Sequence, residues 1–286
     1  MDLPHAFDHS NLLKLSGTPF PFPALQKLLL SATDLVELGL FDIPNSSPDL
    51  IVTALSTLTR LRVLRIGFRS PRPRTDRERR RLSLLKRLIL PSLTGFLFRG
   101  DSEYLEEIVS RIDAPVLGWL KIIFFNQLVF DTPLLRDFFS RTELFREPHR
   151  ADVRVGTNIG LTLFRLKGTV ENPMPVLDVM ISSRVAEWQL SSLAQFCSSS
   201  IPPLPIVDHL SIRGYNYQGL NEGWTDDMES SQWLELLHPF VAVRDLVLPL
   251  QFQDASQVAT ALRELMGTRQ QTCYLHFDES SYILIT

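Results

Sequence analysis

The cysteines and histidines of this sequence are the side chains best suited to bind a metal ion or to act as a nucleophile or base. Cys197 and Cys273 are the only cysteines, and neither has a CxxC partner, so neither a structural zinc site nor a disulfide framework is expected. His209 falls inside a strand-like segment, and His238 lies near the end of a helical one. Both are expected to be surface residues or internally hydrogen-bonded residues. The sequence therefore predicts no metal ligand set and no general base.

The glycine-rich loops that hold phosphates or nucleophiles are also missing from the sequence. It contains no G-x-S-x-G elbow, no P-loop and no G-x-G-x-x-G turn. The nearest candidate, Gly156-Thr157-Asn158-Ile159-Gly160, has the wrong spacing for a dinucleotide. No combination of nucleophile, base and oxyanion site can be assembled from these motifs. We expect a protein that is not an enzyme and needs no cofactor.

Two charged runs are the remaining candidates for a ligand site. Residues 69–81 hold seven arginines, which would suit phosphate binding or nuclear localisation. Asp76 and Glu78 dilute that charge, and no aromatic residue is interleaved for base stacking, so a solvated insert is favoured and nucleic-acid binding is not expected. Residues 221–229 are acidic but lack the order of a calcium loop, which favours a polar connection.

The composition is typical of a folded protein, and its net charge favours no particular class of partner. Apolar residues make up 44% of the 286 positions and the net charge is −3, so disorder is not expected and neither nucleic acid nor anionic lipid is favoured. No run approaches the roughly 18 apolar residues of a membrane helix, and the first residues do not resemble a signal peptide. The expected compartment is the cytoplasm or the nucleus.

A six-residue frame, Φ-x-x-Φ-x-Φ with Φ apolar, recurs along the chain. Its first four copies begin at Leu35, Leu61, Leu93 and Leu117, which are 26, 32 and 24 residues apart. Later copies begin at Val207 and Val243, and looser ones lie near Val153–Val155 and Leu177–Met180. The final Φ-x-Φ places two side chains on one face of a strand, and such a strand buries its apolar face only beside its neighbours. Periods of 20–29 residues are typical of leucine-rich repeats.

The segments between these strands have helical signals. Ser47-Pro48-Asp49 predicts a helix start, with a serine cap and proline in the first turn, and Thr132-Pro133 predicts another. Helices are also expected after Ser102, after Ser230 or Ser231, and from Asp254 to Gly267. Residues 23–33 fit a helix or a strand, and the short distance to the next strand favours the helix.

Strands that alternate with helices predict an α/β fold built from parallel units. We expect a leucine-rich-repeat solenoid, or horseshoe, with a parallel β-sheet on the concave side and helices on the convex side; an ordinary doubly wound α/β domain is the alternative. The repeat domain is expected over residues 1–267. Within it, 1–22 would be a truncated first repeat and 69–83 an arginine-rich insert, and 268–286 would be a divergent C-terminal tail.

Strand alternation also identifies the side chains that point away from the core. Counted from each first Φ, the outward positions are plus two, plus four and plus six. Four of them are cationic and suggest a mildly basic strip, with Trp119 and Phe41 as hydrophobic anchors for a protein partner. The residues predicted to form the partner-binding concave face are Glu37, Phe41, Arg65, Arg99, Trp119, Lys121, His209, Arg213 and Asp245.

Several stretches resemble a family of fungal F-box and leucine-rich-repeat proteins. They include Leu88–Thr94, Ser102–Glu106, Arg111–Pro115, Phe130–Pro133, Glu187–Gln195 and Ser231–Phe240. The resemblance covers roughly residues 3–266 and concerns structural motifs of the repeat domain. In that family an N-terminal F-box docks on the adaptor of a cullin-type ubiquitin ligase, and the repeats are taken to recruit substrate. An F-box is not expected in the residues before Leu35, where the first complete repeat begins.

The resemblance implies a substrate-recognition repeat domain whose partner is a protein. Two alternatives stay open. The chain could be the substrate-receptor subunit of a ubiquitin ligase whose F-box lies upstream of it, in which case the ligase adaptor would be a second partner. It could also be a degenerate paralogue without a partner.

Overall fold

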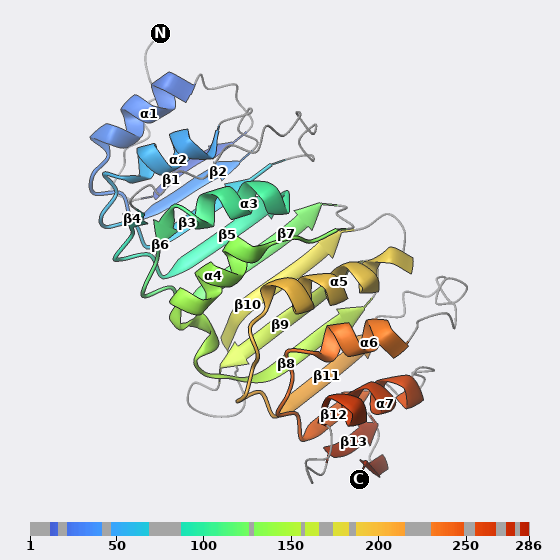
Figure 1. The fold of residues 1–286 in the computed structure, drawn as a ribbon. Helices are drawn as coiled ribbons and strands as arrows, with labels where there is room; N and C mark the ends of the chain where they lie inside the picture. Colours follow the sequence, from blue (N-terminus) through green and yellow to red (C-terminus); the bar gives the residue numbers. More distant parts are fainter. Residues whose placement is uncertain are drawn as a thin grey trace.

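A computed structural model describes most of the chain. The described residues are 12–16, 22–41, 47–68, 87–125, 129–155, 158–165, 174–182, 187–214, 230–248, 255–266, 273–277 and 281–285. The arginine-rich insert 69–83 and the acidic run 221–229 lie outside them. Within the described part the chain forms a mixed α/β structure with a large sheet and seven α-helices (Figure 1).

Twelve strands form the large sheet, and two short strands form a separate pair. The sheet has the order β1-β2-β3-β5-β7-β10-β9-β8-β11-β12-β13-β14, and β4 pairs with β6. The first seven strands are β1 (Leu12–Ser16), β2 (Glu37–Phe41), β3 (Val63–Gly67), β4 (Leu88–Ile89), β5 (Gly95–Gly100), β6 (Ile112–Asp113) and β7 (Trp119–Phe125). The others are β8 (Pro148–Val155), β9 (Ile159–Arg165), β10 (Met174–Ser182), β11 (His209–Gly214), β12 (Asp245–Leu248), β13 (Cys273–Phe277) and β14 (Ser281–Ile285).

Most pairs in the large sheet are parallel, and the exceptions are at its middle and at one edge. Strand β9 runs antiparallel to both β8 and β10, and β14 runs antiparallel to β13. After β7 the chain passes through a helix to β8, returns through β9, and places β10 beside β7. A second helix then leads to β11, which pairs in parallel with β8. The β8–β9–β10 segment, here called the meander, therefore reverses the order of strands at the centre of the sheet.

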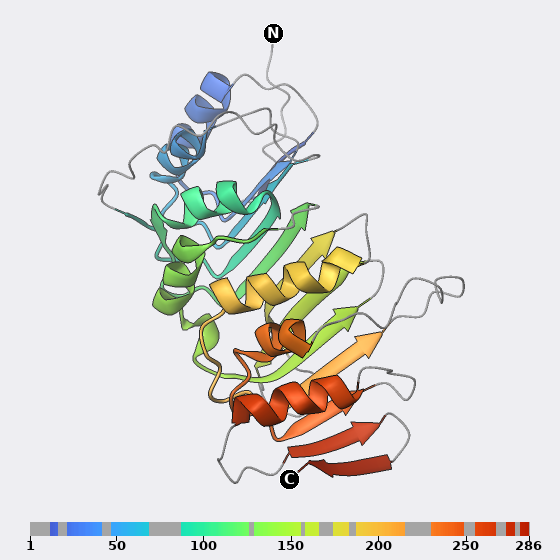
Figure 2. The same cartoon turned by 45° about the vertical axis from the view of Figure 1, so that its right-hand side comes forward.

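All seven helices form one layer on one face of the sheet (Figures 1 and 2). Consecutive helices contact one another from the first to the last. They are α1 (Phe22–Ser31), α2 (Pro48–Leu55), α3 (Ser102–Val109), α4 (Pro133–Arg141), α5 (Glu187–Ser200), α6 (Ser230–Leu237) and α7 (Ala255–Met266), and a short 3₁₀ turn spans Glu143–Phe145. A doubly wound domain would carry helices on both faces. None of the described helices has the length and apolarity that a membrane crossing requires.

The core lies between this helical layer and the sheet. Along β7 buried and half-buried residues alternate, with Leu120, Ile122 and Phe124 beneath the helices. Phe124 packs against Phe196 of α5, with ring centroids 5.8 Å apart. The same alternation places Leu38 and Leu40 of β2 inward. The repeated Φ positions are therefore the inner face of the sheet, as the frame predicts.

The predicted helix starts are confirmed, with one difference in the capping group. Ser47 caps α2, since its hydroxyl accepts the Leu50 N–H, and residues 22–31 form the helix favoured over a strand. Thr132 precedes α4 but makes no side-chain cap. The cap comes from the preceding helix, because the buried Glu106 carboxyl of α3 accepts the Leu135 N–H at 2.5 Å. A glutamate far away in sequence replaces the expected local cap.

One expectation about strands needs correction. The whole of β9 was not anticipated, and the looser repeat copies near Val153–Val155 and Leu177–Met180 belong to the meander rather than to separate repeats. Within residues 268–286, assigned to a divergent C-terminal tail, the described strands extend the sheet: β13 continues it in parallel with β12, and β14 adds an antiparallel strand.

The Glu106 cap gives the fold a specific dependence on pH. Burial raises the pKa of Glu106 to about 7, against the lowering effect of the Leu135 and Leu134 amides. Between about pH 4.5 and 7 the folded chain therefore holds a proton that the unfolded chain has lost. The free energy of unfolding should fall by up to about 3 kcal/mol as pH rises through this window, and should then level off.

Urea unfolding at a series of pH values tests this prediction. Glu106→Gln mimics the protonated carboxyl, so the variant should lose the decrease and keep the cap. Glu106→Ala should lose the cap as well, which costs about 1–3 kcal/mol at low pH. An unchanged pH profile in Glu106→Gln would contradict the role assigned to this carboxyl.

Candidate functional site

The face of the sheet opposite the helices is the candidate site, and we call it the open face. No described helix covers it (Figure 2). Its side chains come from alternate positions of nine neighbouring strands, β2 to β12. They are Glu37, Gly39, Phe41, Val63, Arg65, Gly67, Gly95, Leu97, Arg99, Trp119, Lys121, Ile123, Phe125, Asp178, Met180, Ser182, Gly160, Thr162, Phe164, Arg150, Asp152, Arg154, His209, Ser211, Arg213, Asp245 and Val247.

The structure places all nine predicted site residues on this open face. Strand register arranges them in rows that run across the sheet, because outward positions of neighbouring strands lie beside one another. Arg65 and Lys121 are in the middle row. Glu37, Trp119, His209 and Asp245 lie toward the amino ends of the parallel strands, and Phe41, Arg99 and Arg213 lie toward their carboxyl ends.

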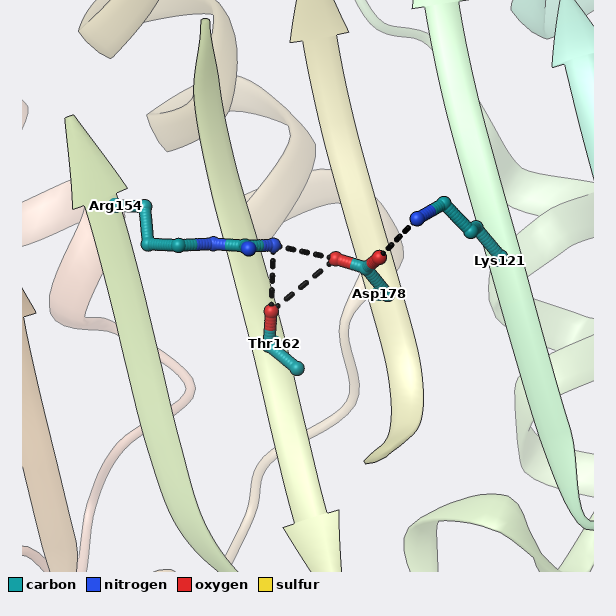
Figure 3. A network of polar contacts seen from close by, with 4 residues as sticks. All are labelled: Lys121, Arg154, Thr162 and Asp178. Carbon is teal, nitrogen blue, oxygen red and sulfur yellow. Dashed lines mark hydrogen bonds and ion pairs between the residues drawn. The ribbon is translucent and has the colours of Figure 1, made fainter. Parts of the chain in front are cut away.

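A polar network at the meander occupies the middle of the open face (Figure 3). Asp178 of β10 accepts a hydrogen bond from Arg154 of β8 at 2.6 Å and one from Thr162 of β9 at 3.1 Å. Its second oxygen lies 2.8 Å from the Lys121 ammonium on β7. Arg154 also donates to Thr162 at 2.9 Å, so its side chain crosses β9 to reach Asp178. One carboxylate thus links four adjacent strands.

The sequence analysis missed the meander's contribution to this face. Arg150, Asp152 and Arg154 alternate with Ala151 and Val153, which is a strand signal in itself. That signal identifies a strand but not its neighbours. Arg150 pairs with Asp152 at 2.8 Å, and neither residue belonged to the predicted site. Asp178 and Thr162 were missed for the same reason.

The predicted basic strip is partly neutralised by neighbouring carboxylates. Arg65 pairs with Glu37 at 2.9 Å, and Lys121 pairs with Asp178. Arg99 and Arg213 differ, because both are exposed and neither forms an ion pair with another described residue. The Arg99 guanidinium lies 5.2 Å from the centroid of the Phe125 ring, and Arg213 donates to the Ser211 hydroxyl at 3.1 Å. The available positive charge is therefore concentrated at two points.

Two aromatic side chains of the open face lie over glycines of a neighbouring strand. The Trp119 indole covers Gly95 so closely that a Cβ at this glycine would overlap the ring. Phe41 covers Gly67 in the same way, and a Cβ there would lie 2.9 Å from Phe41 Cδ1. Both aromatic residues are half-buried. The glycines let the rings lie against the sheet and so fix their positions.

Among the side chains that the structure describes, His209 and Cys197 are the histidine and cysteine whose pKa values are shifted. Burial lowers the pKa of His209, and the adjacent Arg150 lowers it further, whereas Asp245 opposes the shift. His209 is therefore neutral at pH 7 and adds no charge to the open face. Burial raises the pKa of the Cys197 thiol, so this residue is a core side chain and not a nucleophile. Within the described residues no three His, Cys, Asp or Glu side chains form a group that could hold a metal ion.

The Asp178 network should contribute more to stability than an isolated pair on the same face. Asp178→Asn leaves Lys121 and Arg154 beside a neutral group, and we expect a loss of about 1–3 kcal/mol in the free energy of unfolding. Glu37→Gln is the matched comparison, because it breaks the single pair with Arg65 on the same face. That change should cost less than about 1 kcal/mol. Both free energies of unfolding are measured by urea unfolding. Equal decreases in the two variants would mean that the network stabilises the fold no more than a single ion pair does.

The contact of Trp119 with Gly95 can be tested by adding one methyl group. Gly95→Ala should displace the indole, cost about 1–3 kcal/mol, and increase quenching of Trp119 fluorescence by acrylamide. Gly118→Ala is the control, since its Cβ would meet only Thr94 O at 3.4 Å. The same two alanine substitutions are also made in Trp119→Phe protein, and subtracting the fluorescence of these proteins leaves the contribution of Trp119 alone. Similar quenching in the two alanine variants would contradict the close contact.

Comparison with known proteins adds no family or relative to these observations. No protein-family model, no curated protein and no solved structure matches the chain. A functional proposal therefore depends on the geometry of the open face and on the motifs of the sequence.

Proposed function

We propose that the chain is a non-catalytic protein-binding module of the leucine-rich-repeat type, which binds its partner on the open face. The observation that carries this proposal is the one-sided arrangement of the sheet, with every described helix on one face and none on the other. The recurring Φ-x-x-Φ-x-Φ frame supports the solenoid, because its apolar positions are the buried ones. In such a solenoid the uncovered sheet is the concave side.

The composition of the open face supports a protein as partner. Between β2 and β7 its half-buried side chains are largely apolar or aromatic; they are Phe41, Val63, Leu97, Trp119, Ile123 and Phe125. Apolar surface on an uncovered sheet is typical of a binding site. Trp119 and Phe41 are the anchors in this proposal, since large, rigid aromatic side chains contribute most of the energy at protein interfaces.

The polar groups of the open face support binding more than catalysis. The carboxylates of Asp178, Asp152 and Glu37 are each paired with a cation. Paired groups of this kind orient a partner and exclude mismatched ones. A catalytic site instead needs a nucleophile beside a base. In this proposal the cations give orientation and the apolar side chains give affinity.

The resemblance to F-box proteins suggests the partner's role. Under this proposal the chain is the substrate-recognition repeat domain of an F-box-like protein of the cytoplasm or nucleus, and the partner is the substrate. A substrate-receptor subunit of a cullin-type ubiquitin ligase, with its F-box upstream of residue 1, is the alternative. That alternative depends on the same motifs, such as Arg111–Pro115 and Ser231–Phe240.

Site-specific photocrosslinking in a whole-cell extract tests the use of the open face. A benzophenone side chain replaces Leu97 on the open face in one version of the chain and the exposed Glu107 of α3 in another. A protein that crosslinks from position 97 and not from position 107 is the expected result. Capture of the ligase adaptor would favour the ubiquitin-ligase alternative. Identical sets of crosslinked proteins at both positions would contradict the proposal.

The captured protein then serves as the ligand in a binding measurement. Trp119→Ala combined with Arg99→Ala should weaken its affinity by about thirtyfold, as expected for the loss of an aromatic anchor. Leu97→Glu provides a second open-face variant that does not remove the Trp119–Gly95 contact. Glu107→Ala with Arg136→Ala, both exposed on the helical layer, is the control and should bind normally. Unchanged affinity in both open-face variants would exclude this face as the binding site.

A further inference from the structure

The open face carries more positive charge than the chain as a whole. Its described side chains include six cations and four carboxylates, a net charge of +2, with His209 neutral. The whole chain has a net charge of −3. Arg65, Arg150, Lys121 and Arg154 each pair with a carboxylate of this face, whereas Arg99 and Arg213 form no ion pair with another described residue. This separation of charge gives the face a preference for an acidic partner.

Arg99 and Arg213 belong to one row across the sheet, which we call the arginine row. In order across β5, β7, β10, β9, β8 and β11 it consists of Arg99, Ile123, Met180, Gly160, Arg154 and Arg213. Five strand spacings separate its ends, which is roughly 24 Å. Cations therefore lie at both ends, and the half-buried Ile123 and Met180 lie between them.

At Gly160 no side chain projects from the middle of the arginine row. It has no side chain, and a Cβ there would lie 2.8 Å from the Val179 carbonyl oxygen. Arg154 does not stand up from the row, because it is held flat across Gly160 and Thr162 by its bond to Asp178. The row thus has the half-buried apolar side chains Ile123 and Met180 between two exposed arginines.

Both end guanidiniums are held in place without losing their charge. Arg99 stacks on Phe125 at 5.2 Å, and Arg213 donates to Ser211 through Nε at 3.1 Å. These contacts leave guanidinium N–H groups of each side chain for an incoming group. The planar fork of arginine suits a carboxylate, which it binds through two parallel hydrogen bonds. Prior ordering of a side chain reduces the entropy that binding would cost.

We propose that the arginine row binds an extended, acidic segment of the partner protein, with a carboxylate against Arg99, apolar side chains on Ile123 and Met180, and a second carboxylate against Arg213. This inference rests on the proposed function of the open face and adds the chemistry of the bound segment. An extended segment of about seven residues spans the row, at about 3.3 Å per residue. It crosses the strands instead of adding to the sheet.

A nucleic acid fits the same row less well. Its phosphates follow one another at close, regular spacing, whereas the guanidiniums of the arginine row that form no ion pair with another described residue lie at its two ends, roughly 24 Å apart. A peptide can place two acidic groups at the ends and none between. Charge complementarity therefore favours the peptide.

Selection of random peptides displayed on phage, with the full chain as bait, tests the inference. Peptides enriched on the chain should carry acidic residues on both sides of an apolar stretch. Their affinity should fall about tenfold in Arg99→Gln and about tenfold in Arg213→Gln. Arg136→Gln with Arg263→Gln is the matched control, because it also removes two exposed guanidiniums, on the helical layer. That control should bind the peptides as the unmodified chain does.

The outcomes separate this inference from the proposed function. Peptides that lose binding in Leu97→Glu but not in the Arg99 or Arg213 variants would overturn the inference and leave the open face as the binding site. The absence of any peptide that depends on Leu97 would count against both. A random single-stranded oligonucleotide that displaces the peptides at physiological salt, and depends on the same two arginines, would replace the acidic peptide with a nucleic acid.

Discussion

Burial on one side of the sheet is the constraint on which the rest of the structure depends. Each long strand buries every second side chain beneath the helices, as Leu120, Ile122 and Phe124 do in β7. A single layer of helices satisfies that face, and the side chains between them remain at the surface. The open face is thus a direct result of how the core is formed. Its row structure follows from strand register, which aligns outward positions from β2 to β12.

The meander changes what this surface can present. A sheet of regular repeats places side chains of consecutive repeats beside one another. Here β10 returns to lie against β7, so Asp178 meets Lys121, and Arg154 reaches Asp178 over β9. The charges of the centre are thereby paired, whereas Arg99 and Arg213 on either side keep theirs. The polar centre is therefore a consequence of one reversal in strand order.

Local signals in the sequence predicted the alternation of strands and helices and the outward side chains of the strands that carry the six-residue frame. Alternation identified the inward leucines and the outward residues such as Arg65 and Trp119, because burial on a strand has a period of two. Serine and proline marked the start of α2. The sequence did not reveal that Glu106 caps α4 or that Asp178 neutralises Lys121, since both contacts join elements that come together only in the folded chain. Strand order has no local signal.

The position of β10 also has a consequence for the order in which the chain folds. Neighbouring strands before β7 are separated by one short excursion of the chain, but Leu120 pairs with Leu177, 57 positions later. Closing that longer loop costs more entropy than adding the next strand of a regular array. The array from β1 to β7 can grow by local steps, whereas β11 pairs with β8 through Arg150 and His209, which are 59 positions apart. The two pairings that join the meander to its neighbours, β10 with β7 and β11 with β8, therefore carry the largest loop-closure cost among the described strand pairs, so the middle of the sheet, and not its ends, is where its two halves are held together.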